Sequence, residues 1–520
     1  MPFGAVLAQV GGLGRFQVLQ TVLLSVPILL MASHNLLQNF TAAVPPHRCR
    51  VPSATPAATR SPGATPSLPS ATPGPPGATI RSPGGTLRSS NGTLRSSNAI
   101  PSSGPRPTEP CHDGWDYDLS IYVATIVNEW DLVCSYRQLR QMAQSIYMAG
   151  VLVGALLLGG LSDKFGRKAM LMWSYLQLGV MGTCTAFAPN YASYCVFRFA
   201  GGMALSGFGL MVEWIPTPYR AITVAITGFA YTLGQILLAG LAYAVPHWRW
   251  LQLTVSVPFF VFLLYSWWLA ESARWLVLSG KAERAVKVLQ RVARLNKKKE
   301  EGEKITVEVL WSNMKEELVG TSPHLQTSDR PVSLLLSRFS ISFSYYGLAM
   351  DLQNFGVSIY LIQVIFGAVD FPAKVVVTVS LSYIGRRVSL MVALFFAGLV
   401  IIANIFVPTE LQTVRTALAV IGKGCLSASF NCVFLYTTEL YPTPIRQTGL
   451  GFGSTMARVG GIVAPLVKMM DEYYPFLPPA VYGVAPVVAA VAAGFLPETL
   501  NAPLPDTIEE HHGALGEDGG

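Results

Sequence analysis

The feature that most constrains the fold of this chain is a series of long apolar stretches. A helix that crosses a bilayer needs about 20 mostly apolar residues. Twelve such stretches lie near residues 16–38, 143–161, 169–188, 192–212, 221–245, 250–269, 331–349, 358–382, 388–407, 413–437, 447–470 and 477–496. Only 13% of the 520 residues are charged, about half of what a soluble domain carries. The sequence therefore predicts an all-α polytopic membrane protein with 12 transmembrane helices.

Lys and Arg in the short connections predict how the chain is oriented, because basic loops stay in the cytoplasm. One side holds Arg15, residues 164–168, Arg220, residues 274–330, residues 386–387 and Arg446, whereas the opposite short loops hold little more than Arg249. We therefore expect residues 1–15, the loop 270–330 and the tail 497–520 in the cytoplasm, and the loop 39–142 outside. The net charge of +8 comes from these segments and not from a basic stripe, so no nucleic-acid binding is expected.

The segment after the first span cannot build a core. Residues 51–107 contain no Asp, Glu or Lys and are rich in Pro, Ser, Thr and Gly, a composition typical of a disordered stalk. The sequons at Asn39 and Asn91 are N-glycosylation acceptors on the predicted outer side. In the loop 270–330, by contrast, apolar residues recur at helical spacing over 285–295 among Lys and Arg. That pattern predicts an amphipathic helix on the membrane surface.

Three motif pairs reveal an internal repeat. Glu213–Arg220 (EWIPTPYR), after the fourth span, matches Glu439–Arg446 (ELYPTPIR), after the tenth. Likewise Gly166-Arg167-Lys168 matches Gly385-Arg386-Arg387, and Glu271-Ser272 matches Glu498-Thr499, all at separations of 219–227 residues. The chain is therefore expected to form two six-helix halves, residues 16–269 and 331–496, in parallel repeat. Proteins built this way bind substrate near the bilayer midplane between the halves.

The loop Gly160–Lys168 (GLSDKFGRK), between the second and third spans, resembles the loop motif of the major facilitator superfamily. The resemblance implies the major facilitator superfamily fold and transport by alternating access. It also implies that the aspartate and arginine of this motif help to latch the cytoplasmic side. We expect the gating residues to be Asp163, Gly166, Arg167, Glu213, Arg220, Glu439 and Arg446.

Further motifs are similar to the solute carrier 22 family of organic ion transporters. They are Glu271–Leu276 (ESARWL), Glu439–Thr443 (ELYPT) and the long first loop. Asp351–Tyr360 (DLQNFGVSIY), Gly422–Cys425 (GKGC) and Ile445–Gly449 (IRQTG) resemble the renal organic anion exchangers within that family. The resemblance implies exchange of organic anions such as para-aminohippurate for an intracellular dicarboxylate such as 2-oxoglutarate. It also implies the plasma membrane, basolateral in an epithelium. No cofactor or metal is expected, and no phosphate-binding loop or hydrolase motif indicates an enzyme.

Ionisable side chains inside the spans are costly, so they are candidates for function. They are mainly basic: Arg198, Lys374, Lys423, Arg458 and Lys468, against Asp370. Arg458 shares a helix face with small residues and can hold a carboxylate bidentately; the alternative is a structural ion pair. Lys374 either contacts substrate or pairs with Asp370, four residues earlier. For Lys423 we expect a bridge to another helix.

The family resemblance assigns further roles to positions in this sequence. It implies that Arg458 and Lys374 recognise the anion, since the organic cation relatives carry an aspartate at the position of Arg458. It also implies a polyspecific pocket with aromatic walls. Its members are Tyr231, Tyr345, Tyr346, Phe430 and Phe434, with Met31 and Asn35 on the first span and Gln235 one turn from Tyr231.

Three departures from the family pattern support a rival hypothesis. The fourth span is about five residues short of the usual length between Gly207 and Glu213. The seventh span, also read as shortened, begins Ser333–Ser340 (SLLLSRFS) and holds Arg338 where relatives are apolar. The outer region has three cysteines, Cys49, Cys111 and Cys134, whereas relatives have four, and their pairing stays open. The alternative is therefore a transport-inactive variant that serves as a membrane binding or interaction protein.

Overall fold

The computed structural model describes residues 3–51, 109–207, 214–215, 219–319, 329–441 and 446–498. Residues 44–123 form one compact unit, and the remaining chain forms a second, helical unit. Most of the predicted stalk, Asn91, Glu213 and the tail after residue 498 lie outside the described residues.

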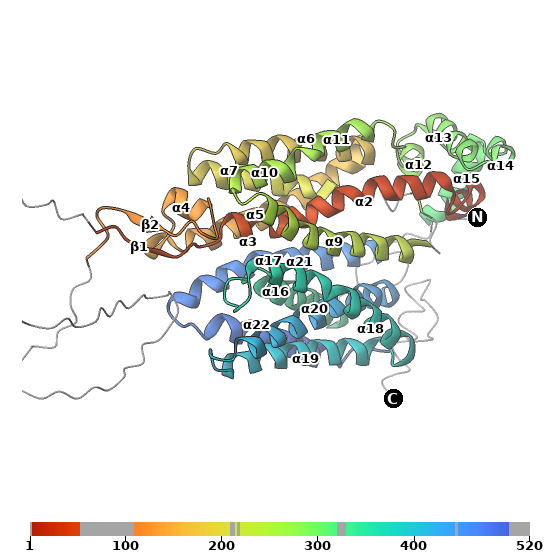
Figure 1. Cartoon of the computed structure of the whole chain (residues 1–520). Helices are drawn as coiled ribbons and strands as arrows, with labels where there is room; N and C mark the ends of the chain where they lie inside the picture. Colours follow the sequence, from red (N-terminus) through yellow and green to blue (C-terminus); the bar gives the residue numbers. More distant parts are fainter. Residues whose placement is uncertain are drawn as a thin grey trace, which may run out of the picture. The chain divides into compact units, whose positions relative to one another are not determined.

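The helical unit consists of two groups of long helices (Figure 1). The first group comprises α2 (Arg15–Leu36), α5 (Leu139–Phe165), α6 (Arg167–Ala186), α7 (Tyr191–Ala204), α9 (Arg220–Ala244), α10 (Trp248–Ser256) and α11 (Pro258–Ser266). The second comprises α16 (Asp329–Ala349), α17 (Ile359–Ala368), α18 (Asp370–Tyr383), α19 (Arg386–Phe406), α20 (Gln412–Leu440), α21 (Arg446–Lys468) and α22 (Leu477–Ala493). A helix or two consecutive helices thus lie at each predicted span. Eight of the described helical segments are long and apolar enough to cross a membrane unaided.

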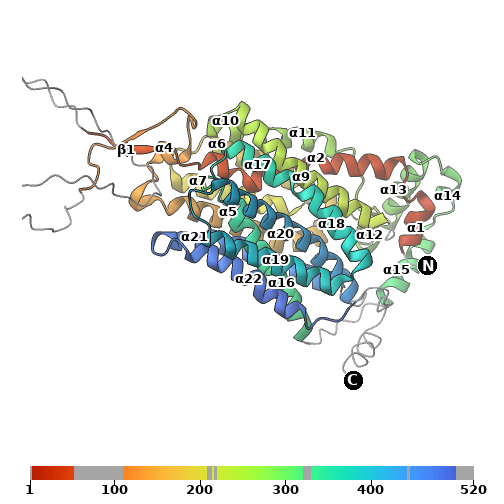
Figure 2. The same cartoon turned by 60° about the horizontal axis from the view of Figure 1, so that its bottom comes forward.

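Two contacts join the groups along their length. Helix α9 packs against α17 and α18, and α5 packs against α21; Figure 2 shows α9 beside α17 and α18. We call the end where α2, α6 and α19 begin, at Arg15, Arg167 and Arg386, the basic end. The other end, which carries α3 (Gln38–Thr41) and α4 (Ile126–Trp130), is the opposite end.

The predicted shortening is not found in the seventh span, and the end of the fourth lies outside the described residues. Helix α7 has 14 residues and continues into a short 3₁₀ turn, Leu205–Gly207, after which residues 208–213 are not described. Helix α16 has 21 residues, so at 1.5 Å per residue it extends over about 30 Å, the thickness of a hydrocarbon core. The seventh span is therefore of full length, and its departure is polarity, because Arg338 and several serines occupy its first half.

The amphipathic helix predicted in the 270–330 loop exists as α13 (Ala282–Leu295), but its apolar face covers protein. Ala285, Leu289 and Val292 are buried in a cluster with side chains of α1 (Phe3–Val10), α12 (Ala273–Leu278) and α15 (Val307–Val319). The expectation of a helix on the membrane surface is thus wrong. The apolar stripe alone did not reveal that the N-terminal helix and the rest of the loop supply its partner.

Asn296, at the end of α13, fastens this small assembly to the start of α2. Its Oδ1 accepts from the backbone N–H of Phe16 at 2.9 Å. Its Nδ2 donates to the carbonyl of Val10 at 3.2 Å and to Oε1 of Gln17 at 2.9 Å. One side chain therefore satisfies backbone groups of two segments that lie nearly 300 residues away in sequence.

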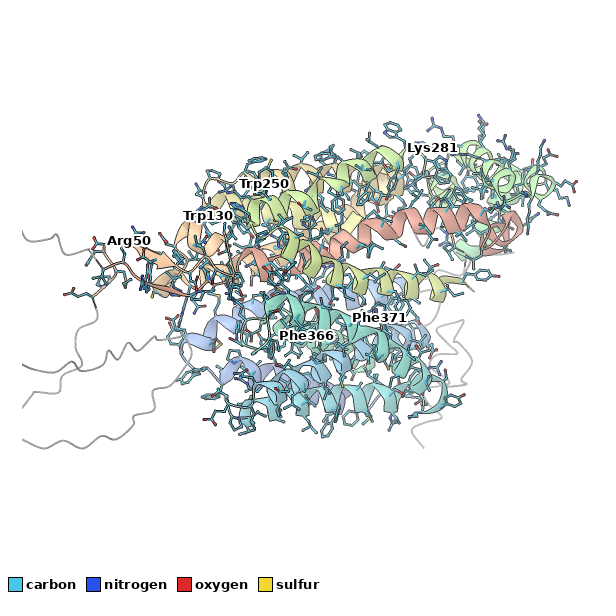
Figure 3. All side chains as sticks on the ribbon, in the orientation of Figure 1. Arg50, Trp130, Trp250, Lys281, Phe366 and Phe371 are labelled. Carbon is cyan, nitrogen blue, oxygen red and sulfur yellow. A yellow bond between two sulfur atoms is a disulfide. The ribbon has the colours of Figure 1, made fainter. Side chains whose placement is uncertain are left out.

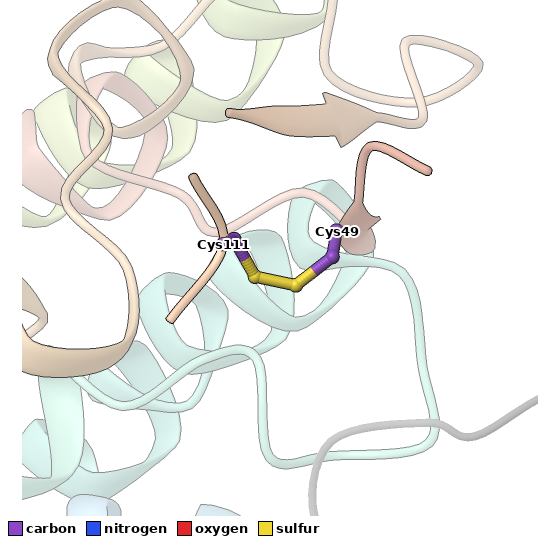
Figure 4. Close-up of a disulfide and its surroundings, with 2 residues drawn as sticks. All are labelled: Cys49 and Cys111. Carbon is purple, nitrogen blue, oxygen red and sulfur yellow. A yellow bond between two sulfur atoms is a disulfide. The ribbon is translucent and has the colours of Figure 1, made fainter. Parts of the chain in front are cut away.

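The unit 44–123 is held by a short antiparallel ladder and a disulfide. Strand β1 (His47–Cys49) pairs with β2 (Trp115–Tyr117), with His47 opposite Tyr117. Cys49 is bonded to Cys111 (Figure 4), which decides the pairing that the sequence left open. Cys134 belongs to the helical unit and is an exposed free thiol.

We expect Asn296→Ala to lower the free energy of unfolding by about 2 kcal/mol, because hydrogen bonds of this kind contribute about 0.5–1.5 kcal/mol each. Thermal unfolding of the purified protein in detergent measures the effect. Lys298→Ala, two residues further along the chain and exposed, is the matched control. Equal melting temperatures for the two variants would contradict the conclusion that Asn296 joins the end of α13 to the start of α2.

Candidate functional site

The repeated loops at the basic end have the same local structure in both halves. Gly166 and Gly385 adopt φ angles of 104° and 105°, which residues that carry a side chain rarely adopt. Each turn is held by a carboxylate from the end of its own half. Glu271 accepts from the backbone N–H groups of Arg167 and Lys168 at 3.1 Å, and Glu498 accepts from those of Arg386 and Arg387 at 2.9 and 3.2 Å. The carboxylate thus satisfies free N–H groups at a helix N-terminus, which favours negative charge.

The predicted gating residues have partners near these turns. The Arg167 guanidinium pairs with Asp163 at 2.6 Å, and that of Arg386 pairs with Glu439 at 3.0 Å. Arg220 begins α9 and Arg446 begins α21, but their side chains, like Glu213, lie outside the described part. A role of these residues in gating stays a prediction.

At mid-depth of the first half, Asn35 lies between two tyrosines. Its Nδ2 donates to the Tyr231 hydroxyl at 3.1 Å, and its Oδ1 accepts from the Tyr147 hydroxyl at 2.7 Å. Asn35 and Tyr147 are buried, whereas Tyr231 remains partly exposed. Tyr147 was not predicted as a site residue from the sequence, because nothing in its own helix distinguishes it from a packing tyrosine.

A buried polar network crosses between the halves at the same depth. The Gln235 amide donates to the Tyr345 hydroxyl at 2.8 Å, and its Oε1 accepts from Lys423 Nζ at 3.2 Å. Lys423 is fully buried and forms an ion pair with Asp370 at 3.3 Å; it also donates to the carbonyl of Phe366. Lys423 therefore bridges helices, as expected, and both ends of the Gln235 side chain are already engaged by protein.

Lys374 does not use the partner that the sequence offered. Asp370 pairs with Lys423, and Lys374 Nζ instead donates to the Thr232 hydroxyl at 3.1 Å. The ammonium also lies 5.4 Å from the ring centroid of Phe229, which stacks on Phe371 (Figure 3). No ion pair joins Lys374 to Asp370, and Lys374 is a half-buried cation of α18 that contacts α9 of the first half.

Arg458 has few partners in the part of the chain that the structure describes. It is half-buried on α21, and Tyr346 is its electrostatic neighbour. Within the described ranges, no hydrogen bond or ion pair engages its guanidinium, so the alternative of a structural ion pair finds no support there. Gly461, one turn further along, brings Tyr346 and Met148 close to the same helix.

The predicted aromatic residues do come together. Tyr345 meets Tyr346 and Phe430 edge to face, each with ring centroids 5.6 Å apart. Phe434 lies one turn beyond Phe430, with the Arg338 guanidinium 5.7 Å from its ring centroid. Met31 packs in the same apolar cluster as Tyr231 and Tyr346. Of the predicted pocket, Asn35, Gln235 and Tyr345 are buried, and the other members keep partial exposure, so the latter are the ones able to meet a ligand.

The halves are joined by further contacts at the opposite end. Arg137 pairs with Glu472 at 3.4 Å, and Arg140 donates to Gln353 at 3.2 Å. Asn39 Nδ2, the predicted glycan acceptor, donates to the carbonyl of Ala349 at 2.9 Å and is buried. The space left here has a volume of about 20 Å³, enough for one water molecule. A glycan on Asn39 is incompatible with this buried arrangement of its side chain.

The two other basic residues of the spans are engaged by protein. Arg198 donates to the carbonyl of His34 and lies 4.0 Å from the ring centroid of Tyr147. Lys468 pairs with Asp351 at 3.1 Å. These contacts give both cations a structural role. Arg458 differs from them because it makes no hydrogen bond or ion pair among the described residues.

Comparison with known proteins agrees with this architecture. Residues 135–465 match the family model of the Major Facilitator Superfamily. The structure resembles the inward open conformation of the xylose transporter XylE from E. coli, with a TM-score of 0.58 at 18% identity, covering 76% of this chain and 93% of that one. At that identity, the likeness concerns the fold alone. The chain is thus a multi-pass membrane transporter of the major facilitator superfamily.

The sequence relatives narrow the family. The chain is 56% identical to solute carrier family 22 member 6-A of Xenopus laevis, over 98% of this chain and 94% of that protein. It is 53% identical to solute carrier family 22 member 6 of Oryctolagus cuniculus, with the same coverage. Organic anion transporter 3 of Rattus norvegicus is 50% identical, again over 98% and 94%. This protein belongs to solute carrier family 22.

We expect Lys423→Met to destabilise the protein by about 3–5 kcal/mol, because it leaves Asp370 as a buried charge without a partner. The double variant Lys423→Met/Asp370→Asn removes both charges and should recover more than half of that loss. Thermal unfolding of the purified variants measures both effects. A double variant no more stable than Lys423→Met alone would show that the ion pair is not the source of the loss.

Proposed function

We propose that this chain takes up amphipathic organic anions such as para-aminohippurate in exchange for intracellular 2-oxoglutarate, as a secondary active transporter. The observation that carries the proposal is Arg458, a half-buried guanidinium with no hydrogen bond or ion pair among the described residues. An intramembrane cation is costly without a counter-charge, so an anionic substrate stabilises it. The name of the organic anion transporter 3 relative supports the same class of substrate.

The surroundings of Arg458 suit substrates that carry both a ring and a carboxylate. Tyr231, Tyr346, Phe430 and Phe434 supply partly exposed aromatic surface, which gives large contact area with little directional demand. Lys374 adds a second positive charge from α18. Arg458 then fixes the carboxylate, and the aromatic side chains accept varied ring systems.

We further propose that the protein lies in the plasma membrane. Both termini then lie in the cytoplasm, as the basic loops indicate. In that orientation the opposite end faces outward, and the contacts of Arg137, Arg140 and Asn39 join the halves on the outer side. Alternating access then requires the halves to rock about the Gln235 network, which breaks these contacts and brings the repeated loops at the basic end together. An outgoing dicarboxylate resets the carrier.

The prediction for transport is that Arg458→Asp abolishes uptake of labelled para-aminohippurate at equal surface level, because a carboxylate now repels the substrate. Uptake by the wild type rises when cells are preloaded with 2-oxoglutarate. Surface biotinylation normalises the amount of protein. Lys287→Asp, the same charge change at an exposed position of α13, is the matched control and keeps its uptake.

Two outcomes would reject the proposal. Wild-type protein at the surface without uptake would favour the rival function of a membrane binding or interaction protein, consistent with the short helix α7. Uptake that does not respond to preloading would show transport without exchange.

A further inference from the structure

Arg338 is a second guanidinium without a counter-charge, and it lies on the face of α16 that carries the aromatic side chain of Tyr345. It lies on α16 seven residues before Tyr345, two turns along the helix and on the same face. It is 7% exposed, and its buried Nε has no hydrogen-bond partner. Its guanidinium contacts Phe434 at 5.7 Å from the ring centroid. In the part of the chain that the structure describes, no carboxylate forms an ion pair with it.

A buried arginine without a partner is destabilising unless something else supplies the negative charge. Two lysines of the same half have carboxylate partners, since Lys423 pairs with Asp370 and Lys468 pairs with Asp351. Arg338 receives only the face of an aromatic ring, whose attraction for a cation is weaker than that of a carboxylate. Arg338 and Arg458 are therefore guanidiniums of the C-terminal half that form no ion pair with a carboxylate among the described residues.

Arg338 and Arg458 both lie at α21, at positions about 140° apart around its axis. Arg338 Nε lies 3.1 Å from the point that a Cβ at Gly453 would occupy, so α21 approaches Arg338 closely there. Gly453 and Arg458 are five residues apart on α21, a rise of about 7.5 Å. The rings of Phe430 and Phe434 follow one another at a spacing of one turn on α20, and Arg338 lies beside the second of them.

We propose that Arg338 is a second anion anchor, which binds the distal carboxylate of dianionic substrates while Arg458 binds the proximal one. The inference rests on the proposed function, since it takes Arg458 as the first anchor. A monoanion engages one guanidinium and leaves the other uncompensated, whereas a dicarboxylate neutralises both. Arg338 thereby sets the preference of this chain for dicarboxylates over aromatic monocarboxylates.

The test measures dissociation constants for 2-oxoglutarate and para-aminohippurate on the purified full chain, by the shift of its melting temperature with ligand concentration. Arg338→Met keeps the length and apolar stem of the side chain but removes the charge. We expect the ratio of the 2-oxoglutarate constant to the para-aminohippurate constant to rise at least tenfold, the loss of one charge-assisted contact. Arg338→Lys keeps the charge and should return the ratio to within about threefold of the wild type.

A second readout is independent of any ligand. Removal of an uncompensated buried charge should leave the ligand-free melting temperature of Arg338→Met equal to or above that of the wild type. A fall in that temperature, or an unchanged ratio of the two constants, would overturn the proposal and indicate that Arg338 is a structural residue.

Failure of the proposed function is distinguishable from failure of this inference. Wild-type protein that binds 2-oxoglutarate but takes up no para-aminohippurate rejects exchange, yet the ratio of constants still decides the role of Arg338. Wild-type protein whose melting temperature responds to neither anion rejects both. An Arg338→Met variant that does not fold counts as a fall in melting temperature and overturns the inference, while uptake and binding by the wild type still test the proposed function.

Discussion

Positive charge inside an apolar bundle is the constraint on which the C-terminal half depends. A cation in the hydrocarbon region must find a carboxylate, a ring of polar groups or a ligand. Lys423 and Lys468 find Asp370 and Asp351, and Arg386 at the basic end finds Glu439. These pairs tie α18 to α20, α21 to the segment after α16, and α19 to α20. Arg458, Arg338 and Lys374 form no ion pair among the described residues, and each lies near an aromatic side chain: Tyr346, Phe434 and Phe229, respectively.

The distribution of strong and weak contacts suits two bodies that move. Within each half, a glutamate holds the repeated turn, Glu271 at Gly166 and Glu498 at Gly385. Between the halves, the contacts are mostly single hydrogen bonds, such as those of Gln235 and Asn39, and the Arg137–Glu472 pair is exposed and therefore contributes little. Each half is thus more strongly bonded internally than to its partner, which is what a rocking motion between intact halves requires.

The periodicity of apolar residues predicted the helices well, because the cost of an unsatisfied backbone in lipid leaves few alternatives. The motif repeat predicted the two halves, and glycine at positive φ explains why those motifs recur. What the sequence did not decide was which partners the side chains take. The stripe on α13 indicated a buried face without saying what buries it, and Asp370 lay four residues from Lys374 but pairs with Lys423 on another helix. The reading of a shortened seventh span was also wrong, because polarity was mistaken for lack of length.

The sequence by itself determined where the apolar helical spans lie, the repeat and the excess of basic residues in the spans, since these follow from local composition and spacing. Only the tertiary structure decided which charges are neutralised, because an ion pair depends on distances between helices that are remote in sequence. It separated Lys423 and Lys468 from Arg458, and it placed Arg338, an anomaly in the sequence, beside Phe434 and close to Gly453. The physical reason is that the cost of a buried charge is fixed by its neighbours in space, which the order of residues does not specify.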